Sequence, residues 1–360
     1  MKILILGNSE RFLFGFKKEL IRELVNRGNE VVVCSDFEHR QEDIKKLGCE
    51  TIAVKISRRS INPVKDYWLY RKYKKIIRDV KPDKVLTYTV KCNIYGGMAA
   101  RKKKVEYYAN ITGLGTSFQK KLLKNIVVRL YKKAFKKVDA VFFENAENLS
   151  VFLKHKIIKE DKAVLVNGSG VNLGEFEFCE MPNNETINFL FLGRIMREKG
   201  IDEFLYVAQR AKEEGLKANF SIVGDYEENY KSQLDKLSSE GVATYYGLQN
   251  DVKKFINECH CVVLPSYHEG MSNTLLEGAA MGRPLIASNI AGCREAVIDN
   301  ESGYLVEKAN KEDLYQKIKN FISLDLEQKK QQGQKSRELV ETHFDREKVN
   351  LQTVEKILGV

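Results

Sequence analysis

The sequence predicts an α/β protein with two doubly wound, parallel-sheet domains in tandem. Short apolar runs alternate with charged segments of helical period along the whole chain, and 360 residues are enough for about two domains. The segment "EFEFCEMPNNET" at 175–186 contains a proline and two asparagines, which is typical of a linker. We therefore expect an N-terminal domain at 1–170 and a C-terminal domain at 171–344. The helix expected at 345–360 is free to pack on either domain, including the first.

Each apolar run is an expected strand. In the first half the runs lie at 3–6, 31–34, 51–54, 85–88, 107–111, 140–143 and 164–166. In the second half they lie at 187–192, 220–223, 243–246, 262–264, 285–287 and 304–306. Strand–helix alternation predicts a Rossmann-like parallel sheet in each half, and such sheets bind ligands beyond the carboxyl ends of their strands. Candidate functional residues are therefore those that directly follow a strand.

The composition is that of a globular protein outside the membrane, with 43% hydrophobic and 30% charged residues. The longest apolar runs, such as 189–193, are far shorter than the roughly 20 residues of a membrane helix, and "MKILILGN" is too brief for a signal peptide. We expect a cytoplasmic protein whose seven cysteines are reduced. "CHC" at 259–261 has metal-ligand residue types, but alternate neighbours on one strand rarely hold an ion without further ligands, so we expect no metal.

Charge is distributed unevenly between the halves. Residues 1–170 carry a net charge of +19 and the remainder −8. Such asymmetry indicates an anionic partner, which this pattern alone leaves open as nucleic acid, acidic lipid or a phosphorylated substrate. A predicted helix within 119–138 has an apolar stripe that we expect to face the core and eight cations that we expect to face an anionic membrane leaflet; the stripe is Leu122, Ile126, Leu130, Ala134 and Val138. Trp68, in "YWLYRKYKK", suits the same interface.

The loop "GRIMREKG" follows the first strand of the second half. Gly193 lets backbone approach a ligand, while Arg194 and Lys199 add a fork-shaped guanidinium and a mobile ammonium that suit a diphosphate. The competing interpretation is ordinary exposed charge. Glycines also follow the next two expected strands, at 224 and 247, which favours a continuous backbone-lined cleft.

The stretch "SYHEGMSNTLLEG" at 266–278 places Glu269 and Glu277 eight positions apart. Thr274 and Glu277 fit a capping box, in which their side chains satisfy helix N–H groups. Alternatively, Glu277 accepts hydrogen bonds from ribose hydroxyls, while free N–H groups at 271–274 bind a phosphate. Both interpretations stay open on the local pattern.

Three segments of the second half carry a family resemblance: "FLGRIMREKGIDEFLYVA", "VLPSYHEGMSNTLLEGAAMGRPLIAS" and "AGCREAVIDNESGYLV". With "GSGVNLGEF", they resemble the retaining GT-B glycosyltransferases of family 4 through nearly all of 163–322. The resemblance implies a GT-B fold, two Rossmann-like domains facing a cleft. It also implies a site in which Arg194 and Lys199 bind the diphosphate of a nucleotide sugar, Glu277 holds the ribose and Glu269 contacts the transferred sugar. The implied backbone contacts to the sugar or distal phosphate come from Gly270, Met271, Ser272 and Asn273.

The first half is similar to a narrower branch, the bacterial enzymes that extend undecaprenyl-diphosphate-linked sugars for capsule, O-antigen or glycoprotein glycans. The similar segments are "SRRSINPVKD", "YTVKCNIYGGMAA", "ITGLGTSF" and "FFENAEN". The candidate acceptor residues are Arg58, Arg59, Lys91, Asn110 and Thr112. Arg58 and Arg59 are candidates for the acceptor's diphosphate, and Asn110 or Thr112 for the role of the missing histidine. The chain departs from the family in two places. It has "GNSERF" in place of paired glycines in the first loop, and "NITGLG" where a histidine usually follows the fifth strand.

The resemblance implies a retaining, metal-independent hexosyltransferase. It would move an N-acetylhexosamine or hexose from a UDP-sugar to an undecaprenyl-diphosphate-linked glycan, at the inner face of the cell membrane. No cofactor and no nucleic acid partner are expected. The chain has no Asp-x-Asp, the metal-holding pattern of the other major fold. Attack by the acceptor on the leaving group's own face is favoured over a covalent intermediate, for which Glu144 is the one candidate carboxylate.

Two other functions remain open on the sequence. Basic helices with interleaved aromatic residues also fit a nucleic-acid-binding protein, although that function leaves the loops of the second half unexplained. A UDP-N-acetylglucosamine 2-epimerase-like enzyme shares the two-domain architecture. It would consume a nucleotide sugar without an acceptor, which distinguishes it from a transferase.

Overall fold

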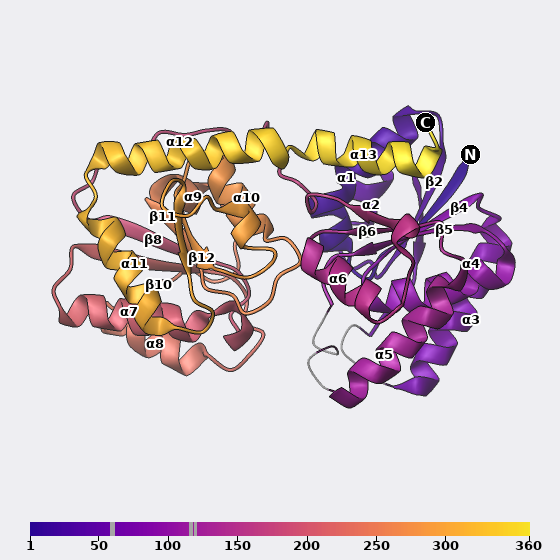
Figure 1. The fold of residues 1–360 in the computed structure, drawn as a ribbon, viewed down its shortest axis with the longest axis horizontal. Coiled ribbons are helices and arrows are strands. Elements are labelled where there is room, and N and C mark those ends of the chain that lie inside the picture. Colours follow the sequence, from indigo (N-terminus) through magenta and orange to yellow (C-terminus); the bar gives the residue numbers. More distant parts are fainter. Residues whose placement is uncertain (58–61, 115–117, 119–120) are drawn as a thin grey trace. The chain divides into compact units, whose positions relative to one another are not determined.

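The computed structural model of the chain describes residues 1–57, 62–114, 118 and 121–360. These divide into two compact units, each an α/β domain around a parallel sheet (Figure 1). Unit 1 comprises Met1–Ser169 and Glu347–Val360, and unit 2 comprises Gly170–Arg346. The predicted fold class is confirmed, and every expected strand is present to within two residues at each end.

Unit 1 has a seven-stranded sheet in the order β3-β2-β1-β4-β5-β6-β7. The strands are β1 (Lys2–Leu6), β2 (Glu30–Ser35), β3 (Glu50–Ala53), β4 (Lys84–Tyr88), β5 (Glu106–Ile111), β6 (Ala140–Phe143) and β7 (Ala163–Leu165). The α-helices are α1 (Glu10–Asn26), α2 (Gln41–Lys45), α3 (Pro63–Val80), α4 (Gly97–Lys103), α5 (Lys121–Ala134), α6 (Ala146–Lys154) and α13 (Arg346–Leu358). Successive residues of a strand point to opposite faces. In β1, Ile3 and Ile5 therefore join the apolar cluster of α1 and α13, while Leu4 and Leu6 join that of α3 to α5.

Unit 2 has a six-stranded sheet in the order β10-β9-β8-β11-β12-β13 around one apolar core. The strands are β8 (Ile187–Leu192), β9 (Ala218–Val223), β10 (Thr244–Tyr245), β11 (Cys261–Leu264), β12 (Leu285–Ser288) and β13 (Gly303–Val306). The α-helices are α7 (Ile201–Glu213), α8 (Lys231–Ser239), α9 (Lys253–Glu258), α10 (Asn273–Ala280), α11 (Lys311–Ser323) and α12 (Leu326–His343).

The C-terminal helix α13 packs on unit 1, although the chain reaches it from unit 2. Val354 and Ile357 lie in the apolar cluster beside α1, and Lys84 donates from Nζ to the carbonyl of Ile357 at 2.7 Å. The last turn of the chain is thereby fixed to β4, the strand beside β1.

The predicted core-facing stripe of α5 is wrong at Ile126, whose side chain is exposed. The side chain of Leu122 lies outside the described residues. The buried positions are instead Val128 and Tyr131, followed by Ala134 and Val138 as expected. The ring of Tyr131 packs edge-on against Phe135 and Phe152, so the core-facing side of α5 is the one that carries Tyr131 and excludes Ile126.

Candidate active site

The strand order of each sheet reverses at one point, between β1 and β4 in unit 1 and between β8 and β11 in unit 2. Loops that leave the carboxyl ends of such a strand pair run in opposite directions, so a ligand has room between them. In unit 2 these loops span 193–200 and 265–272. The predicted donor residues Arg194, Lys199 and Glu269 therefore lie in loops that follow two neighbouring strands. Residues 270–273 lie at the end of the second of these loops.

Glycines let the loops at this edge of unit 2 approach each other closely. A Cβ on Gly224 would lie 1.7 Å from the carbonyl oxygen of Gly193, and one on Gly200 would lie 2.1 Å from that of Pro265. Gly193 also donates from its N–H to Val223 at 3.0 Å, as does Gly224 to the carbonyl of Gly247. The three glycine-bearing loops after β8, β9 and β10 are thus joined by backbone contacts, consistent with the backbone-lined edge expected from the sequence.

The capping-box prediction for α10 is wrong. The helix begins at Asn273, and Ser272 is the N-cap, whose Oγ accepts from the N–H of Leu275 at 3.4 Å. Glu277 therefore lies in the second turn, too far along to reach back to the cap. The N–H of Ser272 is also not free, because it donates to the carbonyl of Gly292 at 2.8 Å. In the described part of the chain, the N–H groups of Met271, Asn273 and Thr274 donate no hydrogen bond and remain candidates for phosphate oxygens.

Lys199 and Glu269, predicted to bind different parts of the donor, form an ion pair with each other. Both side chains are largely buried, with 16% and 10% exposed. Ser266 donates from Oγ to the same carboxylate oxygen at 2.7 Å, a contact that the sequence prediction missed. Arg194 is half exposed, with a guanidinium nitrogen 3.6 Å from Glu227. The site thus combines a largely buried, paired ammonium with a half-exposed guanidinium.

Glu277 is half-buried on α10, near the charged side chains of Arg346 and Glu175. Burial raises its pKa to about 7, and nearby Glu175 adds to this rise, whereas the guanidinium of Arg346 opposes it. Glu277 is therefore about half ionised at neutral pH, and a hydrogen-bond donor such as a ribose hydroxyl would favour the ionised form. Its role at the ribose stays a prediction.

Gly292 is a site residue that the prediction did not name. A Cβ there would lie 2.5 Å from the carbonyl oxygen of Gly270 and 2.8 Å from Cβ of Glu269. It lies four residues beyond the end of β12 at Ser288, so the rule that singled out glycines directly after a strand does not reach it. Its contact fixes the backbone of the turn that carries Glu269.

The acceptor residues predicted in unit 1 are not all described. Arg58 and Arg59 lie outside the described residues. Lys91 donates to Asp66 at 2.7 Å. Asn110 is buried, and its amide lies 3.4 Å from the carbonyl oxygen of Thr87. Thr112 is half-buried just after β5.

Glu144, the candidate nucleophile, is buried at the end of β6. Ser169 donates to its carboxylate at 3.4 Å, and burial raises its pKa to about 7 while the ammonium of Lys17 opposes the rise. Lys17 also lies over the ring of Tyr88, 5.2 Å from its centroid. Glu144 therefore lies in a buried polar cluster within unit 1.

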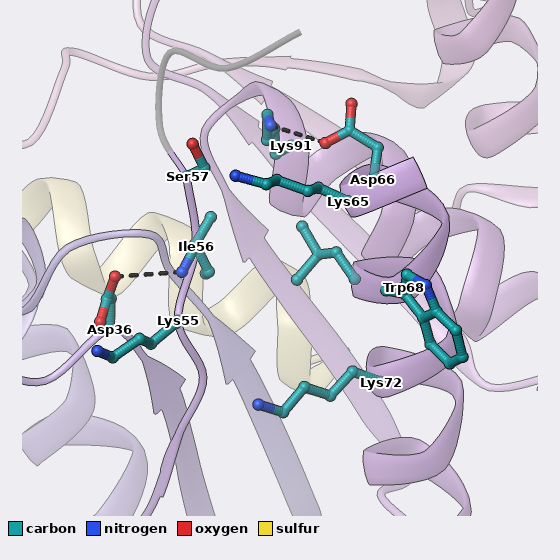
Figure 2. A pocket seen from close by; sticks show the side chains of 10 residues that line it. Asp36, Lys55, Ile56, Ser57, Lys65, Asp66, Trp68, Lys72 and Lys91 are labelled. Carbon is teal, nitrogen blue, oxygen red and sulfur yellow. Dashed lines mark hydrogen bonds and ion pairs between the residues drawn. The ribbon is translucent and has the colours of Figure 1, made fainter. Parts of the chain in front are cut away.

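Sequence prediction also missed a cavity of about 490 Å³ at the carboxyl edge of the unit 1 sheet (Figure 2). We call it the lysine cavity. Its lining residues are Asp36, Lys55, Ile56, Ser57, Lys65, Asp66, Trp68, Leu69, Lys72 and Lys91. The available signal was the spacing of Lys65, Trp68, Leu69 and Lys72, which puts all four on one helical face.

Two family descriptions match the chain in succession. Residues 2–145 match "Glycosyl transferase 4-like" and residues 176–339 match "Glycosyl transferases group 1". The chain is 29% identical over 336 residues to the Campylobacter jejuni N,N'-diacetylbacillosaminyl-diphospho-undecaprenol alpha-1,3-N-acetylgalactosaminyltransferase, covering 88% of each protein. It is 28% identical to the Staphylococcus aureus capsular polysaccharide biosynthesis glycosyltransferase CapM, over 54% of this chain and 56% of CapM.

Solved structures with the same fold include Anabaena HepE in complex with UDP and glucose. That structure aligns over the whole of both chains with a TM-score of 0.81 at 15% identity. A glycosyltransferase from Rickettsia africae aligns over 99% of this chain and 98% of its own, with a TM-score of 0.77 at 20% identity. Across the residues that the structure describes, no helix combines the length and apolarity needed to cross a bilayer.

Proposed function

Because this chain belongs to the group 1 glycosyltransferases of the GT-B fold, we propose that it transfers a sugar from a UDP-sugar to a glycan on undecaprenyl diphosphate. The observation that supports the donor half is that the loops carrying Arg194 and Lys199 and the loop leading into α10 leave the two strands at the strand reversal of unit 2, where Lys199 pairs with Glu269. The acceptor class is supported by the similarity, along 88% of the chain, to an enzyme named for that lipid carrier. The transferred sugar is an N-acetylhexosamine or a hexose.

The transfer proceeds with retention at the sugar C1. The C1–O bond to the diphosphate breaks, its electron pair stays on the diphosphate, and the acceptor hydroxyl oxygen bonds C1 on the same face. The hydroxyl proton passes to the departing diphosphate oxygen. Arg194 and Lys199 stabilise the negative charge that develops there, because fixed cations act most strongly where charge appears in the transition state.

The reaction needs neither a metal ion nor a covalent glycosyl-enzyme in this proposal. The chain contains no Asp-x-Asp pattern to hold a metal on a diphosphate, so its own cations supply that charge. Glu144 is assigned no nucleophilic role, because it is buried and its carboxylate is engaged by Ser169.

Unit 1 also associates with the inner, anionic surface of the cell membrane in this proposal. Near the start of α3, the large side chains of Val64, Tyr67 and Trp68 are exposed. Beside them lies a second cavity of about 520 Å³, lined by Trp68, Arg71, Lys72, Lys74, Lys75, Arg78 and Lys103. Exposed aromatic residues next to clustered cations suit a membrane–water interface.

The test is a mass-spectrometric screen of four UDP-sugars with a short-chain polyprenyl-diphosphate-linked sugar. UDP-glucose, UDP-galactose and their N-acetylamino counterparts are each incubated with and without the acceptor. The expected product is the acceptor plus one sugar, formed with one donor. Conversion of a UDP-sugar without acceptor would indicate an epimerase instead. Salt-sensitive binding of a labelled oligonucleotide with no turnover of any UDP-sugar would indicate a nucleic-acid-binding protein.

A further inference from the structure

The lysine cavity lies where several loops of unit 1 leave the carboxyl edge of its sheet. Asp36 follows β2, Lys55 to Ser57 follow β3, Lys91 follows β4, and the remaining wall is the N-terminal half of α3. Lys91 is also a predicted acceptor residue, and Trp68 and Lys72 also line the second basic cavity; the other lining residues have no role assigned above. Its volume falls in the usual range for small-molecule sites.

The wall from α3 is a single helical face. Lys65, Trp68, Leu69 and Lys72 follow the spacing i, i+3, i+4 and i+7. Leu69 is buried and fixes this face against the core of unit 1. Figure 2 shows the side chains of Lys65 and Lys72 extending from the helix toward the segment that carries Ile56. The two ammonium groups are therefore presented by a rigid element.

The two acidic residues of the cavity are already engaged. Asp36 accepts from the N–H of Ile56 at 3.1 Å, and Asp66 accepts from Lys91 at 2.7 Å and from the hydroxyl of Tyr95 at 3.0 Å. By contrast, the ammonium groups of Lys55, Lys65 and Lys72 form no hydrogen bond or ion pair with any described residue, although the backbone N–H of Lys65 donates to Asn62. Like charges around one cavity repel, and a multivalent anion relieves that repulsion while accepting a hydrogen bond from each ammonium.

We propose that the lysine cavity binds the diphosphate of the lipid-linked acceptor, with Trp68 at its rim beside the lipid. Lys65 and Lys72 supply the main contacts, and Lys55 adds a third cation. Trp68 suits the rim because it is 64% exposed and also lines the neighbouring basic cavity. The identity of the acceptor rests on the proposed function, whereas recognition of a diphosphate rests on the cavity alone.

Trp68 supplies a direct probe, because it is the one tryptophan of the chain. Its fluorescence is followed during titration of the full-length protein with inorganic pyrophosphate and with geranyl diphosphate. We expect a saturable change and a dissociation constant about tenfold higher for Lys65→Gln and for Lys72→Gln. Lys102→Gln, an exposed lysine on α4 outside the cavity, removes the same charge and should leave the constant unchanged. A missing response, or an equal loss in Lys102→Gln, would overturn the proposal.

The source of the bound phosphate is tested with vesicles of phosphatidylcholine and phosphatidylglycerol, with and without a polyprenyl diphosphate. The expected result is a Trp68 response that depends on Lys65 and Lys72 when the diphosphate is present. Lys65 lies outside the second basic cavity, so an equal dependence on Lys65 with phosphatidylglycerol alone would overturn the proposal and assign the cavity to phospholipid headgroups.

A transfer assay separates this proposal from the function on which it rests. Two acceptors carry the same sugar, one on a polyprenyl diphosphate and one as an alkyl glycoside. Lys65→Gln and Lys72→Gln should lower kcat/KM about tenfold for the polyprenyl-diphosphate acceptor and leave it unchanged for the alkyl glycoside. Equal losses for both acceptors would overturn the cavity assignment while leaving the transferase intact. If the wild-type protein transfers sugar to neither acceptor but binds pyrophosphate, the proposed transferase function is wrong, whereas diphosphate binding in the lysine cavity is still supported.

Discussion

The two sheets have the same strand order around their reversal points, but the lysines at their carboxyl edges differ in whether they are paired. In unit 2 the buried ammonium of Lys199 is paired with Glu269, and the surrounding loops touch through glycines. In unit 1, Lys65 and Lys72 border an open cavity and have no partner among the described residues. The net charges of the two sequence halves, +19 and −8, follow the same division.

Under the proposed function, one topology serves two substrates, and this difference in charge pairing fits that assignment. A donor site that stabilises a leaving diphosphate benefits from cations held in place before the reaction. A site for a lipid-linked acceptor benefits from cations that gain a partner only when the anion arrives. The comparison can be tested by changing one feature of each edge at a time.

The largest effect is expected from Lys199→Ala, which removes the fixed cation of unit 2. Loss of one such group should lower kcat for transfer about 100- to 1,000-fold. Arg197→Ala is the matched control, since its side chain is 73% exposed on the same loop and its ion pair with Asp202 is long, at 3.9 Å. An exposed pair of this kind contributes little. If the Lys199→Ala protein folds and keeps the wild-type kcat, the Lys199–Glu269 pair has only a structural role.

Gly224→Ala tests the close packing of the loops in unit 2. The new Cβ would overlap the carbonyl oxygen of Gly193, so we expect a loss of about 3 kcal/mol or more in the free energy of unfolding. Gly247→Ala is the control: it also has a positive φ, of 71°, but its Cβ would meet open space. It should cost about 1 kcal/mol. Urea unfolding followed by circular dichroism measures both, and equal losses would contradict tight packing at Gly224.

The binding of UDP to unit 2 should depend on pH through Glu277. Its folded-state pKa of about 7 lies above the ordinary value, so the ionised form becomes populated only as pH rises through 7. If ribose hydroxyls donate to the carboxylate, UDP should bind about tenfold more weakly at pH 6 than at pH 8. Calorimetric titration of UDP measures this ratio. Glu277→Gln should flatten the profile, and a variant that keeps the wild-type slope would exclude Glu277 as its source.

The raised pKa also has a consequence for stability. A carboxyl with a raised folded-state pKa binds more protons in the folded than in the unfolded state between about pH 4.5 and 7. Its contribution therefore favours folding at low pH and is lost as pH rises across this range. The pH dependence of the unfolding midpoint should thus be smaller in Glu277→Gln than in the wild type.

The smallest effect is expected from Arg71→Gln, in the second basic cavity of unit 1. One cation near an anionic surface contributes about 1 kcal/mol, so binding to phosphatidylglycerol vesicles should weaken about fivefold. Lys46→Gln is the control with the same charge change, because Lys46 is the C-cap residue of α2 and its side chain is 78% exposed. Vesicle sedimentation at low and high salt measures both. Equal weakening in the two variants would indicate a diffuse charge effect with no role for α3.

Local patterns in the sequence were enough to predict the strands and the residues that follow them. A strand needs only a short apolar run, and the alternation of runs with helical segments permits few topologies. Arg194, Lys199, Glu269 and Glu277 were therefore placed on the correct strand ends and on the correct helix before any contact was known. The glycines directly after strands, Gly193 and Gly224, follow from the same pattern, whereas Gly292 lies four residues beyond β12 and does not.

The tertiary structure alone decided which of these groups meet. The cap of α10 is Ser272 and not Thr274, because the contact of Ser272 with Gly292 sets where the helix begins. The pairing of Lys199 with Glu269 spans 70 residues, and the lysine cavity joins loops after three strands to a helix. Such outcomes depend on how side chains are directed across packed elements, which periodicity does not encode. The sequence determined the scaffold and its charges, and packing determined which charges found partners.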